Sequence, residues 1–97
     1  MKFVQIMEFK TSRIDEIDAL EQKWKSATEG RRTLARDMKA RDRDRPNTYM
    51  LIAEFDSYEE AMKNNDLPET KEIAEAMAKL ADGEITFRNL DILDSLS

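Results

Sequence analysis

The alternation of apolar and polar residues predicts two strong β-strands, at residues 2–9 and 48–55. Apolar side chains recur there at nearly every second position, the spacing that places side chains on one face of a sheet. Two runs with weaker alternation, at residues 33–42 and 84–93, predict two further strands. The sequence therefore predicts a sheet of four strands, two of which are rich in apolar side chains.

The residues between the first two strands predict a helix. Ser12 is its expected N-cap, with Asp15 three residues later, and Gly30 follows where a left-handed residue commonly ends a helix. The apolar residues recur three and four positions apart, as one face of a helix requires: Ile14, Ile17, Leu20, Trp24 and Ala27.

The stretch after the third predicted strand favours a helical region in two parts. Asp56 or Ser57 is expected to cap a short helix, because both side chains accept hydrogen bonds from backbone N–H groups. Asn64 and Asn65 are expected to interrupt that helix, and Asp66 to begin a longer one. A break of this kind makes a natural rim for a pocket.

The element order, β-α-β-β-α-β, is that of a ferredoxin-like α+β fold. In this fold a four-stranded antiparallel sheet carries its helices on one face. We expect residues 1–93 to form this single domain and residues 94–97 to form a loose tail.

Both faces of this sheet are predicted to be apolar. In the first strand Phe3 and Met7 point to one side, while Val4 and Ile6 point to the other. Two helices cover only one face, and exposing the other to water forfeits about 25 cal/mol for each Å² of apolar area. We therefore expect a homodimer in which two such sheets pack face to face.

Composition limits the partners of the protein. The net charge is −5, yet residues 31–45 contain seven of the sixteen Lys and Arg residues. Three Asp residues interrupt this segment and no aromatic residue is available to stack on bases, so nucleic acid is not expected as a partner. No apolar run approaches the ~18 residues of a membrane span, and the first ten residues fit a strand and not a signal peptide. A membrane partner is not expected, and a cytoplasmic location is the default.

The chain contains neither His nor Cys. This excludes Ser-His and Cys-His nucleophile pairs and the usual ligands of a zinc site. No glycine-rich phosphate-binding loop is present either. We therefore expect neither a metal nor an organic cofactor.

Three segments resemble a known family. The block "YMLIAEFDSYEEAM" at 49–62, the opening "MKFVQIMEFKTSRIDEI" and the closing "TFRNLDIL" are similar to the dimeric α/β-barrel superfamily, and within it to antibiotic biosynthesis monooxygenase-like domains. The resemblance implies a dimer of ferredoxin-like protomers, each with a pocket between sheet and helices. Members include cofactor-independent oxygenases of aromatic polyketides, haem-degrading enzymes, lactone isomerases and proteins with no demonstrated activity.

The chain departs from one branch of that family. Haem-degrading members rely on a helical His, and this chain has none, so their chemistry does not carry over. The absence of His and Cys, with a final helix rich in Lys, Glu and Ala, occurs in small natural domains and would also suit a redesigned member of the family.

Several polar side chains occupy the otherwise apolar strand faces, where a polar group needs a partner or a ligand. The candidates for catalysis are Glu8 or Glu54 as a proton acceptor, with Arg88 and Asn89 orienting oxygen atoms. The alternative is exposure at strand ends, or ion pairs between Arg36 or Arg88 and these carboxylates. The expected ligand-binding residues are Gln5, Trp24, Tyr58, Met62, Asn64 and Asn89.

Two functions remain open on the sequence. The first is a cofactor-independent oxygenase-type or isomerase-type enzyme acting on a hydrophobic small molecule. The second is a non-catalytic domain that binds a small molecule or serves in assembly. The fold does not choose between them, because this architecture carries many activities.

Overall fold

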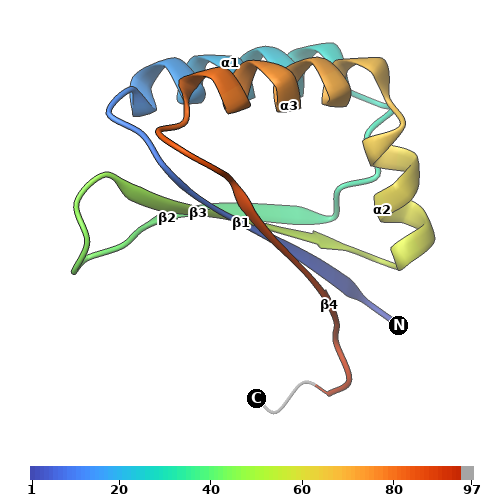
Figure 1. Cartoon of the computed structure of the whole chain (residues 1–97). Helices are drawn as coiled ribbons and strands as arrows, with labels where there is room; N and C mark the ends of the chain where they lie inside the picture. The colour runs from blue at the N-terminus through green and yellow to red at the C-terminus, as the bar shows by residue number, and fades with distance from the viewer. Residues whose placement is uncertain (95–97) are drawn as a thin grey trace.

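The computed structural model describes residues 1–94 as one sheet with helices on one side (Figure 1). The sheet is antiparallel, in the order β2-β3-β1-β4, so the expected ferredoxin-like α+β fold is confirmed. Of the expected tail at 94–97, residues 95–97 lie outside the described part. The elements are β1 (Phe3–Lys10), α1 (Ile14–Ala27), β2 (Arg36–Arg41), β3 (Thr48–Phe55), α2 (Tyr58–Asn65), α3 (Pro68–Leu80) and β4 (Thr86–Asp91).

The strand register determines which side chains face the helices. Phe3 pairs with Phe55 and Phe9 with Tyr49, so these rings lie on the same side of the sheet as α1 and α3. Phe9 packs with Ile17, which has 0% of its surface exposed, and with α3. A second cluster forms under α2, around the first of these strand pairs. The core therefore sits at both ends of the sheet.

The opposite face of the sheet is also apolar, as expected, and no element in residues 1–94 covers it. Met38 and Leu90 lie on this face with 49% and 44% of their surfaces exposed. The register adds more apolar side chains between them, namely Val4, Ile6, Met50 and Ile52. We call these six residues the open face.

Two of the expected helix caps are wrong, and one is confirmed. Helix α1 begins at Ile14 after Arg13, so Ser12 is not its cap; the Oγ1 of Thr11 accepts a hydrogen bond from the Arg13 N–H at 2.9 Å instead. Helix α3 begins at Pro68 after Leu67, so Asp66 does not cap it. Neither helix has a side-chain cap, and α3 begins with Pro68, which has no N–H that needs an acceptor.

The confirmed cap is that of Ser57. Its Oγ accepts a hydrogen bond from the N–H of Glu60 at 3.1 Å, which satisfies one of the donors left free at the start of α2. Gly30, which follows α1, has a φ of 80°, the left-handed conformation expected of it, and Gly83, which follows α3, has a φ of 100°.

Several basic side chains of the segment 31–45 form ion pairs with carboxylates. Arg45 donates to Asp42 at 2.8 Å, and Lys39 pairs with two acidic residues of α1. Hydrogen bonds from the Asp44 N–H and from Arg45 lower the pKa of the Asp42 carboxyl. No helix among residues 1–94 is long and apolar enough to span a membrane.

The cap at Ser57 gives a direct test of this description. We expect Ser57→Ala to lower the free energy of unfolding by about 0.5–2 kcal/mol, because the Glu60 N–H loses its acceptor. Ser12→Ala, which removes an exposed hydroxyl in front of α1, should be near neutral. Urea unfolding followed by circular dichroism measures both, and an equal loss in the two variants would contradict the cap assignment.

Candidate functional site

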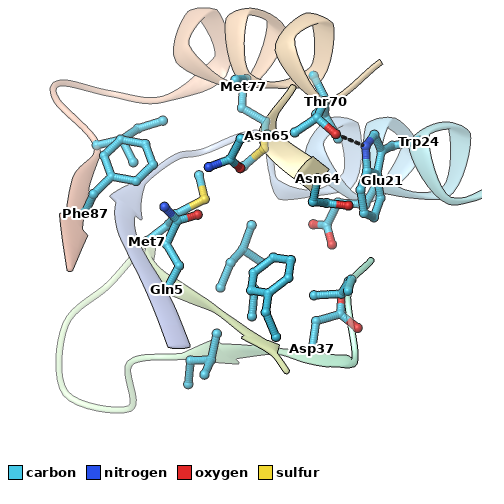
Figure 2. Close-up of a pocket in the computed structure, with 18 of the residues that line it drawn as sticks. Gln5, Met7, Glu21, Trp24, Asp37, Asn64, Asn65, Thr70, Met77 and Phe87 are labelled. Carbon is cyan, nitrogen blue, oxygen red and sulfur yellow. Dashed lines mark hydrogen bonds between the residues drawn. The ribbon is translucent and has the colours of Figure 1, made fainter. Parts of the chain in front are cut away.

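A cavity of about 340 Å³ lies between the helix side of the sheet and the helices α1, α2 and α3 (Figure 2). Its volume falls in the range of small-ligand pockets, about 300–1,000 Å³. Most lining side chains are apolar, and a few polar groups are spaced among them. The lining residues are Gln5, Met7, Glu21, Trp24, Lys25, Leu34, Asp37, Leu51, Ile52, Ala53, Phe55, Asn64, Asn65, Thr70, Lys71, Ile73, Ala74, Met77, Ile85 and Phe87.

The floor of the cavity comes from the central strands. Met7 and Gln5 alternate with outward-facing residues along β1, so both point toward the helices. The Nε2 of Gln5 donates to the Oδ1 of Asn89 on β4 at 3.1 Å. This cross-strand bond orients the Gln5 amide, which Figure 2 shows directed into the cavity.

Trp24 forms one wall, and its ring is fixed on two sides. The indole Nε1 donates to the Oγ1 of Thr70 on α3 at 2.9 Å, which ties α1 to α3 across the cavity (Figure 2). The Arg32 guanidinium lies 5.8 Å from the ring centroid, a cation–π distance. An aromatic surface that cannot rotate is a suitable platform for a planar ligand.

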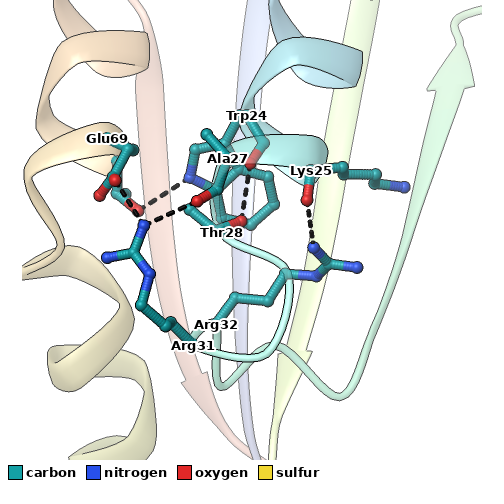
Figure 3. A network of polar contacts seen from close by, with 8 residues as sticks. Trp24, Lys25, Ala27, Thr28, Arg31, Arg32 and Glu69 are labelled. Atoms are coloured by element: carbon teal, nitrogen blue, oxygen red, sulfur yellow. Dashed lines mark hydrogen bonds and ion pairs between the residues drawn. The ribbon is translucent and has the colours of Figure 1, made fainter.

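The loop after α1 is attached to both helices by a polar network (Figure 3). Arg31 pairs with Glu69 of α3 and its Nη2 also donates to the Ala27 carbonyl at 2.7 Å. Arg32 donates to the Lys25 carbonyl at 2.6 Å. These bonds hold the loop beside Trp24 and so fix the shape of this end of the cavity.

The two asparagines at the end of α2 have different roles. Asn64 is buried, and its Oδ1 accepts a 3.4 Å hydrogen bond from the N–H of Thr33, so part of its amide is used to position the loop. Asn65 also lines the cavity, and Figure 2 shows its amide beside Met7 and Met77. The helix break at this point therefore delivers amide groups to the cavity.

One wall of the cavity is charged. Lys25 and Asp37 form an ion pair of 3.5 Å between α1 and β2, and both line the cavity. Glu21, one turn before Lys25, accepts from Lys39 at 2.9 Å. Since β2 is an edge strand with every residue exposed, these pairs close that side by charge and not by apolar packing.

Three of the expected ligand-binding residues, Gln5, Trp24 and Asn64, line the cavity together. Tyr58 instead packs edge-on against Phe3, with ring centroids 5.4 Å apart, and is half exposed. Met62 packs into the small core under α2. Asn89 reaches the cavity only through its hydrogen bond to Gln5.

The candidates Glu8, Glu54 and Arg88 face away from the cavity, on the same side of the sheet as the open face. Glu54 lies 3.8 Å from Arg36, and Glu8 lies 3.7 Å from Arg45. The contact of Glu54 with Arg36 fits the expected ion-pair alternative, whereas Glu8 pairs with Arg45, which was not among the expected partners. These contacts give neither carboxylate access to a ligand in this cavity.

Sequence reasoning missed several lining residues, and for some no signal was available. Phe87 and Met77 look like ordinary core residues until the register and helix packing are known. Glu21 carried a signal, because it lies on the apolar stripe of α1 between Ile17 and Trp24. Asn65 was expected only as a helix breaker.

Known proteins share this fold. No protein-family model matches the chain, and neither does any curated protein sequence. SnoaB, a cofactor-independent oxygenase from Streptomyces nogalater, has a TM-score of 0.81 at 16% identity, over 98% of this chain and 96% of that one. A proposed antibiotic biosynthesis monooxygenase from Caulobacter crescentus has a TM-score of 0.82 at 11% identity, over 96% and 91%.

Rv0793 from Mycobacterium tuberculosis has a TM-score of 0.80 at 14% identity, over the full length of both chains. At these identities the likeness establishes the fold. The structural neighbours include antibiotic biosynthesis monooxygenase-like proteins, as the resemblance of the sequence implied.

The Arg31–Glu69 pair predicts a pH dependence of stability. The hydrogen bond from Arg31 lowers the pKa of the Glu69 carboxyl, so the pair stabilises the fold above the unfolded-state pKa of about 4.3. That contribution is lost as the pH falls through the lower, folded-state pKa. We expect the stability difference between wild type and Glu69→Gln to shrink on acidification from neutral pH.

Urea titrations at neutral and acidic pH measure this difference. In an Arg31→Met background the substitution Glu69→Gln should have a smaller pH-dependent effect, because only the backbone hydrogen bond of the Glu69 carboxylate is left to lower its pKa. A difference that grows toward acidic pH would contradict the assignment.

Proposed function

We propose that this protein is a cofactor-independent, monooxygenase-like or isomerase-like enzyme whose substrate is a hydrophobic, aromatic small molecule. The observation that carries the proposal is the cavity of about 340 Å³, with an apolar lining and a fixed indole wall. Gln5 and Asn65 supply amides that would orient oxygen atoms of the substrate. The fold shared with SnoaB, which is described as a cofactor-independent oxygenase, also supports this proposal.

The second candidate function is non-catalytic binding of the same class of molecule. It is favoured because two polar side chains of the cavity already form hydrogen bonds within the protein. Asn64 accepts from the loop after α1, and Gln5 donates to Asn89. Fold likeness does not weigh against it, since this architecture carries many functions. Turnover separates the two candidates.

We also propose that the working protein is a homodimer packed through the open face. Six apolar side chains on four strands lie on this face. Charged side chains lie on the same face of the sheet as these six residues. They are the acidic Glu8 and Glu54 and the basic Arg36 and Arg88. An isologous interface would place such opposite charges near one another and bury the apolar centre.

The cavity proposal is tested with a hydroxylated naphthalene as the probe. We expect saturable quenching of the single tryptophan, Trp24, and multiple turnovers of oxygen uptake with the wild-type protein. Ala74→Phe should abolish both, because a phenyl group would fill the cavity that Ala74 lines. Ala19→Phe, on the outer surface of α1, is the matched control and should retain both.

Fluorescence titration and an oxygen electrode provide the two readouts. Quenching without oxygen uptake would reject monooxygenase-like turnover of this probe, and quenching with neither oxygen uptake nor an isomerised product would favour the non-catalytic function. Quenching that is unchanged in Ala74→Phe would contradict binding in this cavity.

The dimer is tested at the centre of the open face. Ile6 pairs with Ile52 on β3 and with Arg88 on β4, so Ile6→Glu would place a charge inside the interface. Light scattering at micromolar concentration should give a dimer for wild type and a folded monomer for the variant. A wild-type monomer under these conditions would reject the interface.

A further inference from the structure

Glu21 occupies a position of α1 where an apolar residue is expected. The side of α1 that faces the sheet contains residues three and four positions apart, including Ile17, Glu21, Trp24 and Thr28. Ile17 and Thr28 are both fully buried in this row. A carboxylate in the middle of such a row breaks the pattern of the helix, and breaks of this kind concentrate at functional sites.

The Glu21 side chain is 16% exposed and lines the cavity beside Trp24 (Figure 2). Its Oε1 accepts a hydrogen bond from the Lys39 Nζ at 2.9 Å. Lys39 also pairs with Asp18 on the same helix. The Lys39 ammonium therefore reaches Glu21 from the edge strand β2. Glu21 itself also lines the cavity, most of whose other lining side chains are apolar.

Lys39 remains charged in this arrangement. Partial burial lowers the pKa of Lys39, but its hydrogen bonds to Asp18 and Glu21 outweigh burial and raise the pKa above its ordinary value. The Lys39 ammonium thus contacts one oxygen of the Glu21 carboxylate, and Glu21 also lines the largely apolar cavity.

The other carboxylate of the cavity is less suited to this role. Asp37 lies on the edge strand β2 and pairs with Lys25, and its side chain is 34% exposed. The Asp37 carboxylate is therefore more open to solvent than that of Glu21. Glu8 and Glu54 are on the opposite face of the sheet.

We infer that Glu21 is the catalytic base of the cavity and that the substrate is a weak carbon or oxygen acid, such as a phenol or an enolisable aromatic ketone. The O–H or C–H bond breaks, its electron pair stays on the substrate as phenolate or enolate, and the proton bonds to a Glu21 carboxylate oxygen. This inference rests on the proposed function, since it requires that an aromatic molecule enters the cavity.

A nitrobenzisoxazole tests the inference without knowledge of the natural substrate. A base removes its ring C–H proton, the C–H electron pair forms the nitrile, and the N–O bond breaks to leave a coloured nitrophenolate. The reaction needs no oxidant and no cofactor. Its rate therefore reports a carboxylate base in an apolar cavity.

We expect the wild-type protein to accelerate this elimination and Glu21→Gln to lower the rate about 10²-fold or more, the usual contribution of a positioned general base. Glu16→Gln is the matched control. It neutralises a carboxylate of the same helix that is also ion-paired, with Arg13, but lines the outer groove and not the cavity. The control should retain the wild-type rate.

Two further variants separate chemistry from folding. Glu21→Asp keeps a carboxylate but withdraws it by one methylene, so it should retain thermal stability and lose part of the rate. Glu21→Leu restores the apolar row and should raise the midpoint of thermal unfolding while it abolishes the rate. If the Glu21–Lys39 ion pair served only to stabilise the fold, Glu21→Leu would instead lower the midpoint of thermal unfolding.

Quenching of Trp24 by the nitrobenzisoxazole shows whether the probe enters. Quenching with equal rates in wild type and Glu21→Gln would overturn the inference and leave the proposed function standing. No quenching in the wild type would mean that the cavity does not admit an aromatic bicycle, and the proposed function would fail with the inference.

Discussion

The central position of β1 between β3 and β4 is the constraint on which the rest of this structure depends. Because both neighbours pair with β1 in register, Phe3 and Phe9 line up with the rings of β3 on the helix side. The same register aligns Ile6 with Ile52 on the other side. One strand therefore organises the core, the cavity floor and the open face at once.

The cavity exists because the helices contact the sheet mainly at its two ends. Phe9 and Ile17 form the core at one end, and the ring pair Phe3 and Phe55 forms it beneath α2. Between these clusters α1 and α3 are tied to each other through the hydrogen bond from Trp24 to Thr70. The space left there is where amides and carboxylates meet apolar side chains, which is the composition that small-molecule sites require.

Spacing places Trp24 on the side of its helix that packs inward, and the structure places it in the cavity wall. Spacing also separates Gln5 from Glu8 on the two faces of β1, but it does not say which face of a two-sided apolar sheet the helices cover. On α1 the apolar stripe includes Leu20, which packs toward α3, whereas Glu21 belongs to the row that faces the sheet.

The sequence by itself determined the strands, the helices, their order and the two apolar faces of the sheet, because periodicity and turn residues act locally. It also limited the cap of the short helix to Asp56 or Ser57 and predicted the left-handed conformation of Gly30. Only the tertiary structure decided which face α1 and α3 cover, which carboxylate meets the cavity, and how Arg31, Arg32 and Glu69 hold the loop beside Trp24. Those outcomes depend on contacts between residues far apart in the chain, and no local pattern encodes the distance between them.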